Sequence, residues 1–167
     1  MPTALTYRQA SGADIDQLQA LGQESYGEFA QVLGEQHWNT MNGHLVNRAG
    51  LSQLIEQSVV FVCETNSQIV GMIYLVPSGQ ASELFDKQWS HIRFLGVHTA
   101  YRGLGIGKRL TDHCITHARE TGETHIALHT SEFMDAARAI YEKRGFRQTK
   151  ELEYLGKRYW IYLLGLK

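Results

Sequence analysis

The residues with the clearest chemical potential are three glycines in alternation, Gly103, Gly105 and Gly107, followed by Lys108. Without Cβ atoms, the backbone N–H groups of such a turn can approach an anion closely. An amphipathic helix is predicted to begin at Gly105, and its first turn would add free N–H groups and the positive end of the helix dipole. The sequence therefore predicts a binding site for a phosphate or a pyrophosphate.

The spacing of these glycines does not fit two well-known phosphate-binding loops. A Walker loop, G-x-x-x-x-G-K-[ST], that ends at Lys108 would need a glycine in place of Arg102 and a hydroxyl in place of Arg109. A dinucleotide-binding loop, G-x-G-x-x-G, that starts at Gly103 would need its third glycine where Lys108 stands. Both mismatches argue against a nucleotide-binding protein.

An apolar stretch, His91–Val97, precedes the glycines and predicts a buried strand that leads through a short link into the loop. Gly96 interrupts this strand, and an interior glycine often marks a bulge or a close approach of another backbone. A bulge here would turn backbone groups of residues 95–97 out of the sheet. They would then be free to pair with a ligand that carries amides.

The other elements follow from hydrophobic periodicity and from turn residues. The predicted elements are a strand at Leu5–Tyr7, a helix from Ile15 to Tyr26 with Asp14 as its N-cap, a broken helical segment or a long loop over Gly27–Gly50, a helix around Leu51–Ile55, a hairpin of Val59–Cys63 and Ile69–Val76, a helix from Gly105 that stops at Gly122, a strand at Ile126–Thr130, a helix over Asp135–Arg144, and a final hairpin that turns at Tyr154–Lys157. The order of strands and helices from Phe94 to Phe146 implies a partly parallel sheet covered by helices.

Length and composition are those of one α/β domain over residues 1–167. The chain is 43% hydrophobic and 20% charged, with a net charge of -1. The first residues lack the basic region and apolar core of a signal peptide, and no apolar run is long enough to span a bilayer, so a cytoplasmic protein without membrane contact is expected. The near-neutral charge argues against nucleic acid as the principal partner.

Metal and disulfide chemistry are not expected. Cys63 and Cys114 are the only cysteines, and each lies in an apolar pattern typical of a buried thiol. His113 and His117 are four residues apart on the predicted helix, a spacing that can bind a metal, but no acidic partner or third ligand is evident. A solvated helix edge is the better interpretation of this pair.

A second motif, A-R-A-I-Y-E-K-R-G-F from Ala137 to Phe146, resembles a signature of the GCN5-related N-acetyltransferase (GNAT) family, an alanine followed by Leu/Ile-Tyr-Glu-Lys-x-Gly-Phe. The family's other signature, Arg/Gln-x-x-Gly-x-Gly/Ala, is matched by Arg102, Gly105 and Gly107. The two motifs stand in the right order and separation. The resemblance covers residues 91–146 well and the first half of the chain only by the order of its elements.

The resemblance implies a fold and an activity. The fold is a mixed, twisted central sheet of about seven strands flanked by about four helices, with a V-shaped split at the central strands where acetyl-CoA enters. The activity is transfer of an acetyl group from acetyl-CoA to a primary amine of a small molecule or a peptide, by direct attack. A non-catalytic domain that binds acyl-CoA is the alternative, but it would need neither a base nor Tyr141.

The resemblance also implies which residues contact the cofactor. Residues 102–108 would hold the pyrophosphate through backbone N–H groups, and Leu95 and Val97 would pair with the pantetheine amides. The full implied set is Leu95, Gly96, Val97, Arg102, Gly103, Leu104, Gly105, Ile106, Gly107, Lys108, Thr130, Ala137 and Tyr141. Met134 stands where the family often has an asparagine, so Thr130 or backbone groups are expected to replace that contact.

Two residues are expected to carry the proton transfers. Tyr141 would be the general acid, because a phenol with a pKa of about 10 can protonate a leaving thiolate. His91 occupies a strand position where several family members have a glutamate, and a histidine can act as the general base, directly or through a water. A strand histidine that faces solvent is an equally open interpretation. Glu24 and Glu28 are weaker candidates for the base.

The acceptor amine is not identified by the sequence. Tyr26, Phe29, His37 and Trp38 could line its pocket, or they could complete the core. A backbone N–H near Val97 would stabilise the oxyanion of the reaction. Dimers are frequent in families that resemble this one, so the resemblance also allows a homodimer.

Overall fold

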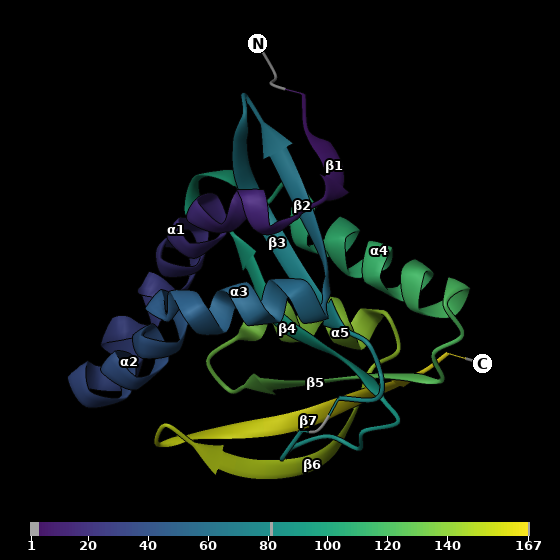
Figure 1. Cartoon of the computed structure of the whole chain (residues 1–167). Coiled ribbons are helices and arrows are strands. Elements are labelled where there is room, and N and C mark those ends of the chain that lie inside the picture. The colour runs from purple at the N-terminus through teal and green to yellow at the C-terminus, as the bar shows by residue number, and fades with distance from the viewer. Residues whose placement is uncertain (1–3, 81, 167) are drawn as a thin grey trace.

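The computed structural model describes residues 4–80 and 82–166, which form a mixed α/β fold around one sheet (Figure 1). The seven strands lie in the order β1-β2-β3-β4-β5-β7-β6, and only the pairing of β4 with β5 is parallel. The strands are β1 (Thr6–Gln9), β2 (Val59–Thr65), β3 (Gln68–Val76), β4 (Ser90–Val97), β5 (His125–Ser131), β6 (Arg147–Tyr154) and β7 (Lys157–Gly165). The predicted fold class, a partly parallel sheet covered by helices, is confirmed.

Helices cover both faces of the sheet. They are α1 (Ile15–Tyr26), α2 (Ala30–Val46), α3 (Arg48–Gln57), α4 (Ile106–Glu120) and α5 (Asp135–Lys143). In the view of Figure 1, α3 crosses in front of the sheet and α5 lies behind it. Leucines of α1 and α3 pack on Tyr74 and Val76 of β3, whereas α4 packs on Ile73 and Leu75 of the same strand. Alternate side chains of β3 therefore pack into two separate cores, one on each face of the sheet.

The sheet splits between its two parallel strands. Strands β4 and β5 are paired only at Ser90 with Ile126 and at His91 with Ala127. Strand β5 stays paired with β7 along its whole length, from His125 to Ser131. Beyond His91 the facing edges of β4 and β5 therefore make no ladder with each other. This is the V-shaped split that the resemblance implied.

The irregularity in β4 is not where the sequence placed it. Ile73 of β3 faces both Phe94 and Leu95, and Phe94 has a φ of 53°, so the bulge lies two residues before Gly96. Gly96 instead makes room for a side chain of α1, because a Cβ at this position would lie 2.6 Å from Oγ of Ser25. The prediction of a bulge at Gly96 is therefore wrong, although a bulge is present in the strand.

The segment from Gly27 to Gly50 is helical, and the long-loop alternative is wrong. Helix α2 follows a short 3-10 turn at Gly27–Phe29 and bends at Gly34, which has non-helical angles of φ 79° and ψ 166°. Asn47 then ends α2 and caps α3, since its Oδ1 accepts a hydrogen bond from the N–H of Gly50. The predicted helix around Leu51–Ile55 is confirmed as α3.

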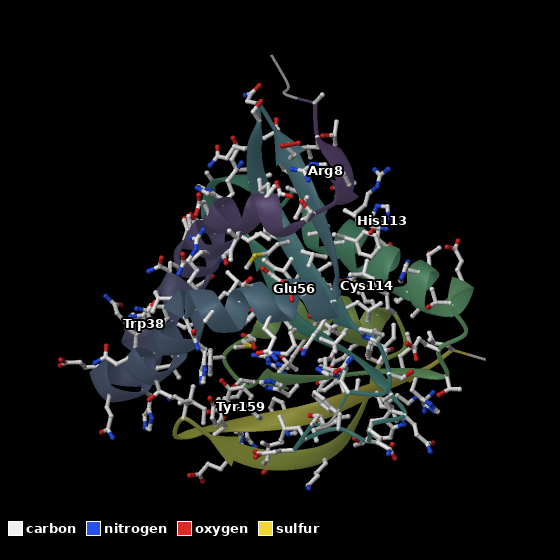
Figure 2. The ribbon with its side chains drawn as sticks, in the orientation of Figure 1. Arg8, Trp38, Glu56, His113, Cys114 and Tyr159 are labelled. Carbon is white, nitrogen blue, oxygen red and sulfur yellow. The ribbon has the colours of Figure 1, made fainter. Side chains whose placement is uncertain are left out.

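The two histidines of α4 lie on a packed face rather than at a solvated edge. The rings of His113 and His117 are half-buried and contact Phe61 of β2, with centroids 5.6 and 5.7 Å from its ring. Figure 2 labels His113 and the neighbouring residue Cys114 on α4. Cys63 and Cys114 are buried free thiols, as predicted. Among the described residues, no three His, Cys, Asp or Glu side chains are grouped as a metal site would require.

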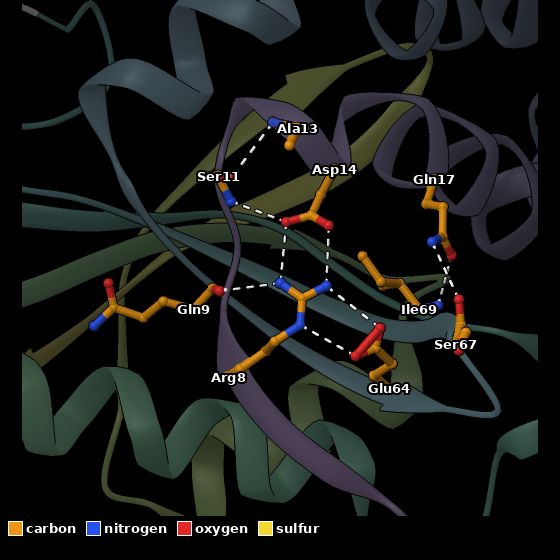
Figure 3. Close-up of polar contacts among 9 residues, drawn as sticks. All are labelled: Arg8, Gln9, Ser11, Ala13, Asp14, Gln17, Glu64, Ser67 and Ile69. Atoms are coloured by element: carbon orange, nitrogen blue, oxygen red, sulfur yellow. Dashed lines mark hydrogen bonds and ion pairs between the residues drawn. The ribbon is translucent and has the colours of Figure 1, made fainter.

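A network centred on Arg8 ties β1 to the start of α1 and to β2 (Figure 3). The Arg8 guanidinium donates to both carboxylate oxygens of Asp14, at 3.0 and 2.9 Å, and its Nε donates to Glu64 at 3.2 Å. Asp14 also accepts from the N–H of Ser11 but makes no side-chain cap on α1. The prediction of Asp14 as the N-cap residue of α1 is confirmed, but its carboxylate pairs with Arg8 and makes no capping hydrogen bond to that helix.

We expect Arg8→Met to lower the free energy of unfolding by roughly 1–3 kcal/mol at pH 7, since two half-buried carboxylates lose their charged donor. The hydrogen bonds from Arg8 lower the pKa of Asp14. A carboxyl with a lowered folded-state pKa stabilises the fold above its unfolded pKa of about 3.9, and that contribution is lost as the pH falls through the folded value. The deficit of the variant should therefore shrink in urea unfolding below about pH 4.

Arg48→Met is the matched control, because Arg48 pairs with Asp16 at a site where the two side chains are 55% and 84% exposed. It should cost less than about 0.5 kcal/mol. Equal losses in the two variants would contradict the special role of the Arg8 network.

Candidate active site

One large cleft, with a volume of about 1120 Å³, opens where β4 and β5 separate. Its lining comes from both strands, from the C-terminal end of α1, from the loop before α4, from the first turns of α4 and α5, and from the β6–β7 turn. Segments far apart in the sequence therefore meet at the split. No helix among residues 4–80 and 82–166 has the length and apolar character needed to cross a bilayer.

The glycine loop forms one wall of this cleft. Gly103 and Gly105 have φ values of 83° and 80°, and a Cβ on either would meet no atom within 4 Å. Gly105 is the N-cap of α4 and offers no side chain to cap it. The first hydrogen bond of the helix runs from the N–H of Arg109 to the carbonyl of Gly105 at 3.1 Å. The N–H groups of residues 106–108 are thus left for a ligand, and the open space over the loop fits a pyrophosphate.

The third glycine of the loop serves helix packing. A Cβ on Gly107 would lie 3.0 Å from Cδ1 of Ile140, so this glycine lets α4 approach α5 closely. Leu104 is 59% exposed and is not among the residues that line the cleft. All the other residues implied to contact the cofactor line it: Leu95, Gly96, Val97, Arg102, Gly103, Gly105, Ile106, Gly107, Lys108, Thr130, Ala137 and Tyr141.

The side chain of Arg102 is turned towards the protein. Its Nε donates to the carbonyl of Val97 at 3.2 Å, its Nη2 donates to the carbonyl of Ser25 at 3.0 Å, and the guanidinium pairs with Glu28. Arg102 therefore fastens the glycine loop to β4 and to α1, while the backbone of the loop faces the cleft. The arginine of the motif acts here by positioning the loop.

The backbone of β4 is open along the split. The carbonyl of Leu95 accepts from the Tyr26 hydroxyl at 3.2 Å, and the carbonyl of Val97 accepts from Arg102. A carbonyl has two lone pairs, so each can still accept a second hydrogen bond from a ligand amide. On the opposite side of the split, the Thr130 hydroxyl donates to Sδ of Met134 at 3.7 Å, a weak interaction that another acceptor could replace.

Tyr141 lies in the wall of the cleft on α5 and is only 4% exposed. Its ring packs against Phe146, with the centroids 5.4 Å apart. Burial raises the pKa of the Tyr141 phenol well above its ordinary value, with smaller contributions from Tyr26 and Cys114. The hydroxyl is therefore protonated at any physiological pH, which is the state that a general acid requires.

His91 is buried in the cleft wall rather than facing solvent. It is 8% exposed, and its ring lies 4.9 Å from that of Phe85. Burial lowers the pKa of His91 to about 4, assisted by Arg93 and His129. Burial also lowers the pKa of His129 to about 4, with Arg93 as the second cause. Both rings are therefore neutral at neutral pH and can accept hydrogen bonds.

His129 was not found by sequence reasoning. It lies on β5 and lines the cleft, and its Nδ1 is buried without a hydrogen-bond partner in the described part of the chain. The sequence carries a weak signal for it, a histidine in a strand that otherwise reads as apolar. That signal gains meaning only from the parallel pairing of β5 with β4, which places His129 near His91.

The two glutamates proposed as weaker bases are engaged elsewhere. Glu24 accepts from the N–H of Thr99 at 3.0 Å and from its hydroxyl at 2.6 Å, and it is not among the residues that line the cleft. Glu28 lines the cleft but pairs with Arg102. Both glutamates hold the segment between β4 and α4 against α1.

Aromatic side chains line the cleft on the side of α1 and α2. Tyr26 and Phe29 are among them, as the sequence suggested, and Phe29 packs edge-on to Phe133 at 4.9 Å. His37 and Trp38 do not line the cleft, although the His37 ring comes within 3.1 Å of where a Cβ on Gly156 would lie. Figure 2 shows Trp38 on the outlying helix α2, away from Tyr159 of β7, which does line the cleft.

The neutral histidines predict a pH dependence of stability. Their folded pKa values of about 4 lie below the unfolded value near 6.5, so the unfolded chain binds more protons between these pH values. We expect the free energy of unfolding to fall as the pH drops through 6.5 and to stop falling from this cause near pH 4. Urea unfolding at half-unit pH steps would measure it. A His91→Gln/His129→Gln variant with the same slope as the wild type would contradict the assignment.

Comparison with known proteins agrees with this arrangement. The sequence model of the Acetyltransferase (GNAT) family matches residues 21–146. The chain belongs to this family. The match includes the whole of the split, the glycine loop and Tyr141.

Individual GNAT relatives resemble part of the chain. It is 31% identical over 97 residues to N-acetyltransferase family 8 member 3 of Rattus norvegicus, a match that covers 58% of this chain and 42% of that protein. It is 30% identical over 96 residues to the probable N-acetyltransferase camello of Xenopus tropicalis, covering 57% and 41%. The chain thus spans less than half the length of these curated relatives.

Solved structures share the fold over nearly their whole length. The PaiA N-acetyltransferase from Thermoplasma acidophilum, crystallised with coenzyme A, has a TM-score of 0.78 and 16% identity, covering 97% of this chain and 99% of its own. The ribosomal-protein-alanine N-acetyltransferase from Brucella melitensis has a TM-score of 0.73 and 24% identity, covering 96% and 99%. These solved structures share the fold of the described residues.

Proposed function

We propose that this GNAT domain, over residues 1–167, transfers an acetyl group from acetyl-CoA to a primary amine by direct attack. One observation carries the proposal. An uncapped helix N-terminus, opened by glycines with positive φ, leads directly into the split between β4 and β5, and a buried protonated phenol lines the same cleft. The cleft would thus connect an anion-binding site, at the N-terminus of α4, with a proton donor, Tyr141, along strand edges that are unpaired.

The glycine loop and the first turn of α4 would hold the pyrophosphate on the N–H groups of residues 106–108. The pantetheine amides would pair with backbone groups at Leu95 and Val97, beside the unpaired edge of β4. The amine nitrogen then forms a bond to the thioester carbonyl carbon, and the C–S bond breaks. Tyr141 gives its phenolic proton to the departing thiolate sulfur. The oxyanion formed on the way would accept a hydrogen bond from a backbone N–H near Val97.

The attacking amine must lose a proton to become a nucleophile. His91 is neutral and lines the cleft, so it can accept a hydrogen bond from the amine. Its pKa of about 4 makes it a weak proton acceptor, so we propose that it relays the proton to water and does not keep it. His129 is a second neutral ring that could share this relay.

Calorimetric titration with acetyl-CoA and with ATP, followed by thiol release with a panel of amines, tests the proposal. We expect binding of acetyl-CoA, no binding of ATP, and thiol release that depends on an amine. Binding of acetyl-CoA with no amine-dependent thiol release would instead indicate a non-catalytic acyl-CoA-binding domain. Binding of ATP alone would overturn the proposal entirely.

A further inference from the structure

Arg93 is a positive charge in the cleft without a negative partner. Its guanidinium carbon lies 4.9 Å from the centre of the Phe94 ring, and its side chain remains accessible from the cleft. Within the described residues, no carboxylate lies within ion-pair distance of Arg93 and no hydrogen bond is made by its guanidinium. Burial lowers the pKa of Arg93, and the groups that oppose this are the phenols of Tyr26 and Tyr154.

The register of the sheet places Arg93 on the face opposite the glycine loop. Arg93 pairs with Tyr74 of β3, and Tyr74 belongs to the core formed with α1 and α3. Leu95 and Val97 pack instead towards the core beneath α4. The bulge at residues 94–95 lets both Arg93 and Phe94 turn to the α1 side. Arg93 therefore lies on the side of the split away from the proposed cofactor.

Of the other charged side chains that line the cleft, Lys108 lies on the side of the glycine loop and three are paired. Arg102 pairs with Glu28, and Asp135 pairs with Arg138. The remaining carboxylate in the lining is Glu83, which is exposed on the loop before β4 and makes no ion pair within the described residues. The nearby rings of His91 and His129 are neutral at neutral pH. On the side of the cleft away from the proposed cofactor, the Arg93 guanidinium is therefore an unpaired positive charge beside neutral rings.

We propose that Arg93 binds a carboxylate of the acceptor, so that the acceptor is a free α-amino acid with an apolar side chain. A guanidinium fork matches the two oxygens of a carboxylate, and the pairing would supply the counter-charge that the protein lacks. The Tyr26 ring contacts the rings of both Phe29 and Phe94 edge-on, and the three rings offer an apolar surface beside it. This inference rests on the proposed acetyltransferase function and names its substrate class.

The test compares amines that differ only in the carboxylate. The probes are phenylalanine, leucine and methionine, each beside its carboxamide, with phenethylamine as the decarboxylated form of phenylalanine and O-phosphoethanolamine as a phosphate-bearing amine. Thiol release from acetyl-CoA gives kcat/KM for each, expressed per deprotonated amine. We expect at least one acid to be preferred over its amide by roughly 10- to 100-fold.

Arg93→Gln should reduce that preference to about one while changing the KM for acetyl-CoA less than about twofold, and Arg93→Lys should keep part of it. Arg147→Gln is the matched control, because Arg147 is exposed on β6 and outside the cleft. It should leave the preference unchanged.

The outcomes separate this inference from the function on which it rests. Acetylation of amines with no preference for the acids would overturn the inference and leave the acetyltransferase proposal standing. Faster acetylation of O-phosphoethanolamine than of any amino acid would overturn the assignment to a carboxylate. Equal losses for acids and amides in Arg93→Gln would show a structural role and contradict it, as would binding of acetyl-CoA with no acetylation of any acid.

Discussion

Gly105→Val should weaken the binding of coenzyme A by roughly 100-fold, or about 2.7 kcal/mol. Gly105 holds a φ of 80° in open space at the uncapped start of α4. A β-branched side chain is strained in that conformation, so the turn must shift and the three N–H groups behind it lose their common direction. The new side chain would also occupy the space that the diphosphate needs. Calorimetric titration with coenzyme A measures the loss.

Gly122→Val separates this effect from loss of stability. Gly122 ends the same helix with a φ of 83°, and a Cβ there would also meet nothing within 4 Å. Both variants therefore carry the same backbone strain, which should lower the free energy of unfolding by about 1–2 kcal/mol in each. Only Gly105→Val should lose affinity. A similar affinity for coenzyme A in the two variants would contradict the placement of the glycine loop in the binding site.

Tyr141→Phe should lower kcat by roughly 100-fold or more while changing the affinity for acetyl-CoA less than about threefold. The phenol is buried in the cleft wall, and its raised pKa keeps it protonated, so its removal takes away a proton donor and little binding surface. Steady-state kinetics together with titration separates the two quantities. Equal losses in turnover and affinity, or no loss in either, would refute the role of Tyr141 as general acid.

Tyr74→Phe is the matched control for the loss of a buried hydroxyl. Tyr74 is fully buried on β3, its hydroxyl has no hydrogen-bond partner among the described residues, and it does not line the cleft. Its replacement should leave kcat unchanged and should keep or slightly raise the free energy of unfolding. A fall in kcat similar to that of Tyr141→Phe would point to general damage of the fold.

Local patterns predicted most of the second half of the chain. Gly105 and Gly122 mark the ends of α4, and the apolar stripe between them is typical of a helix that packs on a sheet. The motif that ends at Phe146 likewise located α5. These signals are local, since a glycine with positive φ or an apolar period of 3.6 acts within a few residues.

The bend in α2 and the position of the bulge in β4 were not predicted, because tertiary contacts decide them. Helix α2 bends at Gly34 and exposes Val32 and Val46, so its apolar periodicity is weak. The bulge in β4 was placed at Gly96, since a glycine is the usual local signal for one. Phe94 instead takes the positive φ, and the packing of its ring against Tyr26 and Tyr74 accompanies that conformation.

The sequence by itself determined that a glycine-rich turn opens a helix after a buried strand, and that a tyrosine follows on the next helix. Only the tertiary structure decided which other side chains meet them. His91, Arg93 and His129 converge because β4 and β5 pair for two residues and then separate. This parallel pairing joins residues more than thirty positions apart, such as His91 and Ala127, so the spacing of neighbouring residues does not predict it.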